Sequence, residues 1–137
     1  MPFVERIECE SPGIGLHEIT DPVRDAVARA QVDQGLCTVF IAHTSASLVI
    51  QENADPSAAR DLERWFGRLV AEDDPLYTHT AEGPDDMPAH IRSALTATSV
   101  AIPILEGRLA LGTWQGLFLF EHRRGRHRRN VVVHVAE

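Results

Sequence analysis

Two histidines and three carboxylates crowd into twelve positions near the middle of the chain, and they could together hold a divalent cation. This set comprises His79, Glu82, Asp85, Asp86 and His90. Its members occupy a loop containing glycine and proline and the first turn of the helix expected after it. The spacing matches no standard zinc signature such as H-E-x-x-H. A plainer interpretation is also open, in which Asp86 caps the helix and His79 is solvated.

A third histidine stands where a buried strand is expected to end. His43 is followed by two hydroxyl residues within the next two positions, Thr44 and Ser45. One interpretation is a catalytic or ligand histidine with hydroxyls that hold phosphate oxygens. The other is a strand-end histidine that is hydrogen-bonded to the backbone. A serine hydrolase is disfavoured, because the sequence has no G-x-S-x-G elbow.

A glycine-flanked turn from 112 to 116 presents a large aromatic residue and a primary amide, Trp114 and Gln115. Glycine permits close backbone approach to a ligand, so an amide N–H of this turn could contact substrate. The alternative is a β-bulge with a tryptophan in the core. Strand alternation carried back across Gly116 predicts that Gln115 shares a face with Glu121.

Glu121 follows Leu117 and Leu119 on the strand face that is expected to be buried. A buried carboxylate needs a cation, a proton or several hydrogen-bond donors. We expect Glu121 to face the histidines directly or through a metal ion or water. The competing interpretation is a structural salt bridge with an arginine of the basic segment 123–129. That segment is either a solvated turn that offsets the acidic loop or a phosphate clamp, and only a weak case exists for RNA.

Composition excludes several classes of protein. All 13 basic residues are arginine, so Schiff-base chemistry, pyridoxal phosphate held as an internal aldimine and a P-loop are excluded. A net charge of −7 opposes binding to a nucleic-acid backbone. The first residues lack the features of a secretory signal and no apolar run is long enough to cross a bilayer, so a cytoplasmic protein without a membrane partner is expected. Cys9 and Cys37 are expected to be packing residues.

The periodicity predicts one α+β domain over residues 1–137, with a mixed or antiparallel sheet and a few helices. Strand character occurs at 3–10, 36–42, 47–52, 99–105, 108–111, 117–122 and 130–136. A first helix is expected from an Asp21–Pro22 start to a Gly35 end, a second follows Asp55–Pro56, and a short third begins near Pro88. Residues 71–86 should form a long loop, and loops of this length are usually functional or disordered.

Several of these stretches, in this order, resemble the YjbQ family of small proteins. They are His43 to Ser47, Glu52 to Pro56, Glu82 to Ile91, Leu111 to Gly116, and Glu121 to Arg123. The resemblance covers nearly the whole chain. It implies an α+β trimer with a polar site near subunit boundaries. It also implies secondary thiamine-phosphate synthase activity, in which hydroxymethylpyrimidine diphosphate is joined to a phosphorylated thiazole and pyrophosphate is released.

The resemblance also implies roles for individual residues. Those expected to be catalytic are His43, Glu82, His90, Gln115 and Glu121, and those expected to bind metal are His43, His79 and His90. Those expected to bind substrate or phosphate are Thr44, Ser45, Asn53, Gly112, Thr113 and Arg123. A divalent Mg²⁺ or Zn²⁺ ion would neutralise the leaving group. The three histidines should meet in one pocket, to which two subunits could contribute. The alternative is a non-catalytic trimer that binds a metal or a phosphorylated metabolite.

Overall fold

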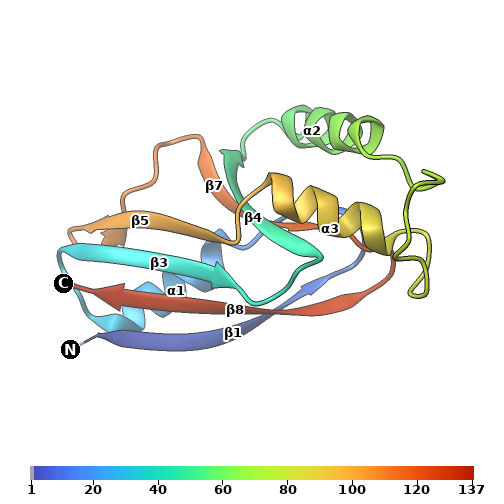
Figure 1. Ribbon diagram of the computed structural model, residues 1–137. Helices are drawn as coiled ribbons and strands as arrows, with labels where there is room; N and C mark the ends of the chain where they lie inside the picture. Colours follow the sequence, from blue (N-terminus) through green and yellow to red (C-terminus); the bar gives the residue numbers. More distant parts are fainter. Residues whose placement is uncertain (1) are drawn as a thin grey trace.

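Two antiparallel β-sheets and three helices make up the α+β fold, which confirms the predicted fold class. The computed structural model describes residues 2–137. The elements in chain order are β1 (Phe3–Ser11), β2 (Gly15–Glu18), α1 (Thr20–Ala30), β3 (Gly35–Ile41), β4 (Ala46–Glu52), α2 (Pro56–Leu69), α3 (Asp86–Leu95), β5 (Ser99–Leu105), β6 (Arg108–Leu109), β7 (Gln115–Glu121) and β8 (His127–Ala136). Figure 1 shows α1 behind the larger sheet and α2 and α3 together beside β4 and β7.

The larger sheet has five strands in the order β1-β8-β3-β5-β6, and the smaller has three in the order β2-β7-β4. Strand β8, the last of the chain, lies between β1 and β3. Its pairing with β1 sets Phe3 opposite Val135, so both ends of the chain lie at one edge of the fold (Figure 1). Its pairing with β3 sets Val39 opposite Val133.

The main core lies between the inner face of the larger sheet, helix α1 and the inner face of the smaller sheet. Val131, Val133 and Val135 alternate along β8 and are fully buried. They belong to one apolar cluster with Leu117 and Leu119 of β7. Burying each side chain of this size stabilises the fold by about 1.5–3 kcal/mol relative to exposure, as an upper estimate. This cluster therefore holds the two sheets together.

The second face of β7 is buried as well, because α2 and α3 cover it. Phe120 packs edge-on against Phe66 of α2, with ring centroids 5.3 Å apart. Residues 116–122 are consequently all buried. Burial of both faces explains why residues 117–120 are all apolar. A continuous apolar run is typical of strands that are covered on both faces.

Three local features differ from the sequence-based expectation. Helix α1 begins one residue before Asp21, after Ile19, and no side chain caps it. It ends at Gln31 in the left-handed conformation, at φ 54°, and not at Gly35, which opens β3. Strand β2 was not predicted. By contrast, the predicted start of α2 is confirmed, because the Asp55 side chain accepts a hydrogen bond from the Ser57 amide at 2.9 Å.

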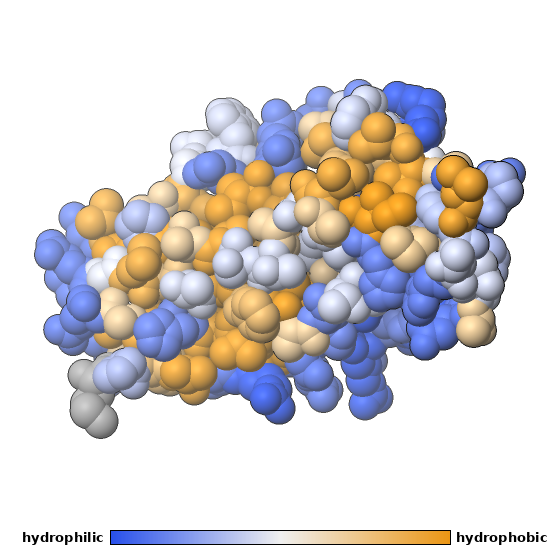
Figure 2. All heavy atoms as spheres, in the orientation of Figure 1, coloured by the Kyte–Doolittle hydropathy of each residue, from blue (hydrophilic) through white to orange (hydrophobic). Residues whose placement is uncertain are grey.

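The outer face of the larger sheet is uncovered in the single chain. Figure 2 shows hydrophobic residues gathered over this face. The large apolar side chains exposed there are Val4, Leu36, Phe40 and Leu105. Helix α2 also leaves Trp65 and Leu69 half exposed. No helix formed by residues 2–137 has the length and apolar character needed to cross a membrane.

Candidate functional site

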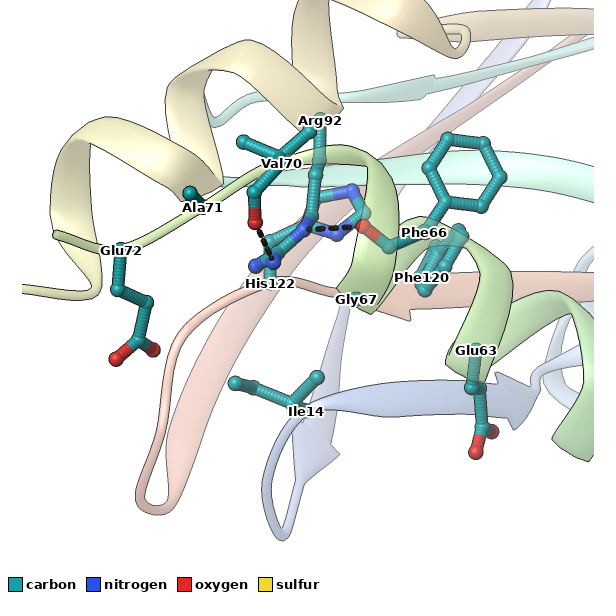
Figure 3. Close-up of a pocket in the computed structure, with 10 residues that line it drawn as sticks. All are labelled: Ile14, Glu63, Phe66, Gly67, Val70, Ala71, Glu72, Arg92, Phe120 and His122. Carbon is teal, nitrogen blue, oxygen red and sulfur yellow. Dashed lines mark hydrogen bonds between the residues drawn. The ribbon is translucent and has the colours of Figure 1, made fainter. Parts of the chain in front are cut away.

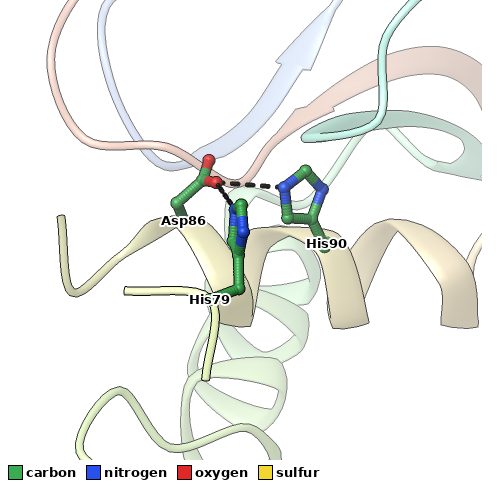
Figure 4. A group of neighbouring side chains, drawn as sticks. All are labelled: His79, Asp86 and His90. Carbon is green, nitrogen blue, oxygen red and sulfur yellow. Dashed lines mark hydrogen bonds and ion pairs between the residues drawn. The ribbon is translucent and has the colours of Figure 1, made fainter. Parts of the chain in front are cut away.

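His79, Asp86 and His90 converge at the N-terminal end of α3. Asp86 and His90 lie one turn apart on the helix, and His79 reaches them from the preceding loop (Figure 4). Nε2 of His79 lies 2.6 Å from Oδ2 of Asp86, and Nε2 of His90 lies 3.0 Å from the same oxygen. One nitrogen from each ring and one carboxylate oxygen all lie within 4.8 Å of one another. Three potential ligand atoms therefore surround one small volume.

The protonation of His90 is determined by a backbone carbonyl. Nδ1 of His90 lies 3.0 Å from the carbonyl oxygen of Thr44, which can only accept a hydrogen bond. Nδ1 must therefore carry a proton, and Nε2 faces Asp86 with a lone pair in the neutral ring and with an N–H in the imidazolium. A lone pair 3.0 Å from a carboxylate oxygen is repelled unless a proton or a cation lies between them. A carbonyl that orients a ligand histidine in this way is a common second partner at metal sites.

Asp86 is held from its other side by Arg123. Nη1 of Arg123 donates to Oδ1 of Asp86 at 2.8 Å, so Oδ2 remains directed at the two histidines. Burial raises the pKa of the Asp86 carboxyl, but hydrogen bonding to His79 and the nearby positive charges outweigh it. The pKa therefore lies below its usual value, and Asp86 is a carboxylate at neutral pH. It is almost fully buried and is the negative centre of the site.

The site is open on one side. The side chains of His79 and His90 are 45% and 30% exposed, whereas that of Asp86 is 3% exposed. A carboxylate oxygen of Glu82 lies 4.0 Å from Nε2 of His79 at this open side. An ion held by the three inner atoms would retain room for water or another oxygen ligand. Two imidazoles and one carboxylate suit zinc and neighbouring transition metals, whereas Mg²⁺ prefers oxygen ligands alone.

His43 does not join this group, which corrects the prediction that it is a metal ligand with His79 and His90. Its Nε2 accepts a hydrogen bond from the Asn130 amide at 2.8 Å, so the lone pair needed for a metal is occupied. Its Nδ1 lies 3.4 Å from Nη1 of Arg129. Burial, followed by the charge of Arg129, lowers the pKa of His43. The backbone-bonded alternative describes this histidine.

Glu121 does not face the histidines either, and the competing interpretation, a structural salt bridge, describes it. The side chain is fully buried and forms a two-point ion pair with Arg129 of β8. Ser11 donates to Oε1, and the amides of His122 and Arg123 donate to Oε2, each at 3.1 Å. Burial raises the pKa of Glu121, but these donors, led by Arg129, lower it overall. Every oxygen lone pair is in use, so no ligand position remains.

The predicted substrate-orienting turn lies at the opposite end of β7 from Glu121. The six residue steps from Gln115 to Glu121 span about 20 Å of extended strand. Oε1 of Gln115 accepts the Gly112 amide at 2.7 Å and closes the turn that contains Thr113. Asn53 donates a side-chain hydrogen bond to Glu18 at 3.1 Å. Within one chain, the residues of this turn and Asn53 are therefore remote from His79 and His90.

Arg123 and Arg124 of the basic segment pair with acidic residues and not with one another around a free anion site. Arg123, predicted to bind phosphate, donates from Nε to Asp85 at 2.9 Å and from Nη2 to the Glu82 carbonyl at 3.1 Å, besides contacting Asp86. Arg124 pairs with Glu72. The plainer interpretation, an arginine-rich turn that offsets the acidic loop, describes this segment.

Of two other predicted phosphate-binding residues, only Thr44 contributes to the site, through its backbone. The carbonyl of Thr44 orients His90, whereas the carbonyl of Ser45 accepts from the amide of His122, outside the site, at 3.3 Å. Asp86 was among the five potential ligands recognised from the sequence, although the resemblance implied a metal site of His43, His79 and His90 without it. The signal was its spacing of four from His90, which places both on one face of a helix. His122 and Arg129 carried no comparable signal.

Comparison with known proteins gives a consistent family. The family described as "UPF0047 protein YjbQ-like" matches residues 5–137. UPF0047 protein sll1880 of Synechocystis is 58% identical over 124 residues, covering 90% of this chain and 84% of that protein. UPF0047 protein YjbQ of Salmonella typhimurium is 46% identical over 110 residues, covering 80% of this chain and 79% of that protein. The resemblance noted in the sequence is thereby confirmed.

Solved structures agree with this result. The conserved hypothetical protein TT1486 of Thermus thermophilus is 35% identical, with a TM-score of 0.85 over 94% of this chain and 97% of that one. A YjbQ/UPF0047 family protein of Clostridium acetobutylicum is 34% identical, with a TM-score of 0.84 over 95% and 99% of the two chains. The YbjQ-like protein SSO2532 of Sulfolobus solfataricus, at 24% identity and a TM-score of 0.85 over 98% of each chain, shares the fold.

The same comparisons correct the activity that the resemblance implied. The relatives carry only the UPF0047 designation, and the neighbouring structures are described as hypothetical, uncharacterised or of unknown function. Nothing in these names supports a thiamine-phosphate synthase or a transferase, so that prediction is contradicted. Because the family match spans nearly the whole chain and sequence identity reaches 58%, the chain belongs to the UPF0047 (YjbQ-like) protein family.

Proposed function

We propose that this protein is built around a mononuclear divalent-metal centre. Nε2 of His79, Oδ2 of Asp86 and Nε2 of His90 bind an ion of the zinc class, and the exposed side of the site takes an oxygen ligand. The observation that carries this proposal is the Thr44 carbonyl, which leaves the Nε2 lone pair of His90 facing the Asp86 carboxylate at 3.0 Å. A bridging cation turns this repulsive arrangement into an attractive one. Tetrahedral bonds of about 2.0 Å place ligand atoms about 3.3 Å apart, which needs only a small outward movement.

The chemistry that such a centre supports is activation of a bound water or polarisation of a bound oxygen group. Three protein ligands and an open position are the usual composition of a catalytic zinc site, whereas structural sites are closed by four. The Glu82 carboxylate lies near the open position and can accept a proton from a metal-bound water. We therefore extend the proposal to a metal-dependent enzyme that acts on a small molecule.

Metal titration tests the first step. The purified chain is stripped with a chelator and titrated with Zn²⁺ by calorimetry and with Co²⁺ by visible absorption. We expect one ion per chain and the intense visible bands of four-coordinate Co²⁺, with no competition from millimolar Mg²⁺. His79→Ala and His90→Ala should each lower Zn²⁺ affinity by about a hundredfold, which corresponds to about 2.7 kcal/mol.

The matched control is His17→Ala, which removes an imidazole whose Nε2 is hydrogen-bonded to the Gly13 carbonyl at 2.7 Å, away from Asp86. It should leave Zn²⁺ affinity unchanged. Wild-type affinity in both His79→Ala and His90→Ala, or equal losses in all three variants, would overturn the metal centre. If Zn²⁺ binds as expected but no metal-dependent hydrolysis of small esters is detected, the centre stands and the catalytic extension falls.

The oligomeric state follows as a separate proposal. A homotrimer would cover the exposed apolar residues on the outer face of the larger sheet, among them Phe40 and Leu36. Sedimentation velocity at micromolar concentration should show a trimer, and Phe40→Glu should dissociate it; a stable wild-type monomer would refute it. A small phosphorylated substrate and the absence of nucleic-acid and membrane partners stay predictions, as does a cytoplasmic location.

A further inference from the structure

A cavity of about 270 Å³ opens between α2, α3 and the outer face of the smaller sheet. Figure 3 shows its lining, which is apolar except for one arginine, one histidine and two glutamates. The lining residues are Ile14, Glu63, Phe66, Gly67, Val70, Ala71, Glu72, Arg92, Phe120 and His122. His79, Asp86 and His90 are not among them. The cavity is therefore distinct from the proposed metal centre, although both are built on α3.

Arg92 supplies a buried positive charge to this cavity without a matching carboxylate. The residue is 5% exposed, and its guanidinium donates to two backbone carbonyls, that of Val70 at 2.9 Å and that of Phe66 at 3.4 Å. Among residues 2–137, no carboxylate lies within 4.0 Å of it, in contrast to the equally buried Arg129. Burying an unpaired charge costs free energy of folding, and an anion bound beside Arg92 would reduce this cost.

His122 supplies an unused polar atom to the same cavity. The residue is fully buried, and its Nδ1 has no hydrogen-bond partner in the part of the chain that the structure describes. Its Nε2 lies 2.9 Å from Oγ of Ser47, which lies 2.6 Å from the hydroxyl of Thr96. That hydroxyl also lies 2.9 Å from the carbonyl oxygen of Arg92, which can only accept, so these contacts do not direct the ring proton to Nδ1. Nδ1 is thus a buried polar atom at the cavity whose hydrogen-bonding capacity is unused.

The two carboxylates of the lining do not pair with Arg92. Both oxygens of Glu72 are engaged by Arg124. Oε1 of Glu63 accepts the Leu16 amide at 2.9 Å, and Figure 3 shows Glu63 on the opposite side of the cavity from Arg92. Neither carboxylate is recorded within ion-pair distance of Arg92. The cavity thus has one end with the unpaired charge of Arg92 and a body lined by Phe66, Phe120 and other apolar groups.

We propose that this cavity is a binding site for a small organic anion, distinct from the metal centre. The carboxylate of the ligand accepts hydrogen bonds from Arg92, and its apolar part packs against the rings of Phe66 and Phe120. The volume of about 270 Å³ limits the ligand to roughly the size of a single aromatic ring with one acid group. The anion supplies the negative charge that the buried guanidinium of Arg92 lacks.

Benzoate is a suitable probe, because it combines one carboxylate with one ring. The ¹⁵N-labelled full chain is titrated with benzoate, and amide shifts are followed by NMR. We expect saturable shifts that centre on Gly67, Ala71 and His122, with a dissociation constant of about 1 mM. Benzamide has the same shape without the charge and should bind at least tenfold more weakly. Equal binding of the two probes, or no saturable shifts near the cavity, would overturn the proposal.

Variants locate the interaction. Arg92→Gln should lower benzoate affinity at least tenfold, whereas Arg68→Gln, an exposed arginine of α2 that does not line the cavity, should not. Asp86→Asn should bind benzoate as the wild type does, which separates this site from the metal centre. Unchanged benzoate affinity in folded Arg92→Gln would refute the assignment. If Arg92→Gln does not fold, the comparison of benzoate with benzamide on the wild-type chain decides the question.

Discussion

Two buried carboxylates near the junction of β7 and α3, Glu121 and Asp86, have opposite surroundings. Glu121 is enclosed by fixed donors, with Arg129, Ser11 and two backbone amides occupying both oxygens. Arg123 donates a hydrogen bond to one carboxylate oxygen of Asp86. The other oxygen faces one nitrogen from each of the two imidazoles, on the partly exposed side of the site. The first arrangement is complete without a ligand, and the second is incomplete.

The comparison shows that burial alone does not identify a functional carboxylate. Glu121 is the more deeply buried of the two, yet its environment only stabilises the fold. What distinguishes Asp86 is the kind of atom that faces it, because a neutral imidazole nitrogen offers a lone pair and an arginine offers a proton. The proposal of a metal centre at Asp86 therefore rests on the atoms that face its carboxylate and not on its depth below the surface.

The largest effect is expected at Glu121, whose two carboxylate oxygens are both paired with donors of the chain. Glu121→Gln leaves Arg129 buried without its counter-ion, so the free energy of unfolding should fall by about 3–5 kcal/mol. Zn²⁺ affinity of the folded protein should not change. Urea denaturation and calorimetry measure the two quantities, with the exposed Glu8→Gln as a control. Intact stability together with weakened Zn²⁺ binding would return Glu121 to the metal site.

Acidification tests the same buried region through His122, whose pKa is lowered to about 3, chiefly by burial and then by the charge of Arg92. The unfolded chain binds this proton near pH 6.5 and the folded chain only near pH 3, so stability is complete above pH 6.5 and is lost as the pH falls. Between pH 6.5 and 5 this one group should remove about 2 kcal/mol. Metal-free wild type and His122→Gln are compared by urea denaturation at both pH values. Equal losses in the two proteins would show that His122 does not contribute.

A smaller effect is expected at Asp86, when its partner Arg123 is replaced. Arg123→Gln removes the donor that holds Oδ1 of Asp86, so Oδ2 is no longer fixed toward the histidines. Zn²⁺ affinity should fall about tenfold, as is usual when an outer partner of a ligand is lost. Arg126→Gln, at a mostly exposed position in the same turn, is the control. If the two variants bind Zn²⁺ equally, Arg123 does not position Asp86.

The smallest effect is expected at the remote turn. Gln115→Ala removes the acceptor of the Gly112 amide, which water can replace because the turn is exposed. The loss of stability should be about 1 kcal/mol or less, with Zn²⁺ affinity of the isolated chain unchanged. Thermal unfolding and calorimetry measure both. A large drop in Zn²⁺ affinity would mean that this end of β7 communicates with the site, contrary to the separation seen in one chain.

Elements with a strong local pattern could be predicted from the sequence. The alternating valines of β8 and the Asp55–Pro56 start of α2 are examples, since each depends on a few neighbouring residues. Strand β2 could not, because its four residues follow a glycine-containing break and pair only with β7, about a hundred positions away. Boundaries of α1 were missed because no side chain caps its start.

The candidate site was predictable only in part, and for the same reason. His79 and His90 lie in one loop and one helix, so their proximity follows from local sequence. The pairing of Glu121 with Arg129 does not follow from local sequence. Strand periodicity predicts the face on which a side chain lies but not the element that covers this face. Periodicity also placed Gln115 on the same face as Glu121, but it did not take into account the length of strand that separates the two residues. Distance along a strand separates residues that share a face.

The position of β8 has a consequence for how the chain acquires its structure. Strand β8, which is synthesised after the other strands of this fold, is an inner strand of the larger sheet and joins β1 to β3, so β1 has no neighbour in that sheet until β8 has been made. Folding therefore depends on contacts between residues more than a hundred positions apart, and such high contact order is typical of slow folding. Until then β1 is an unpaired strand edge, which invites pairing with other nascent chains. Disruption of β8 would therefore damage the interior of the larger sheet and not its margin.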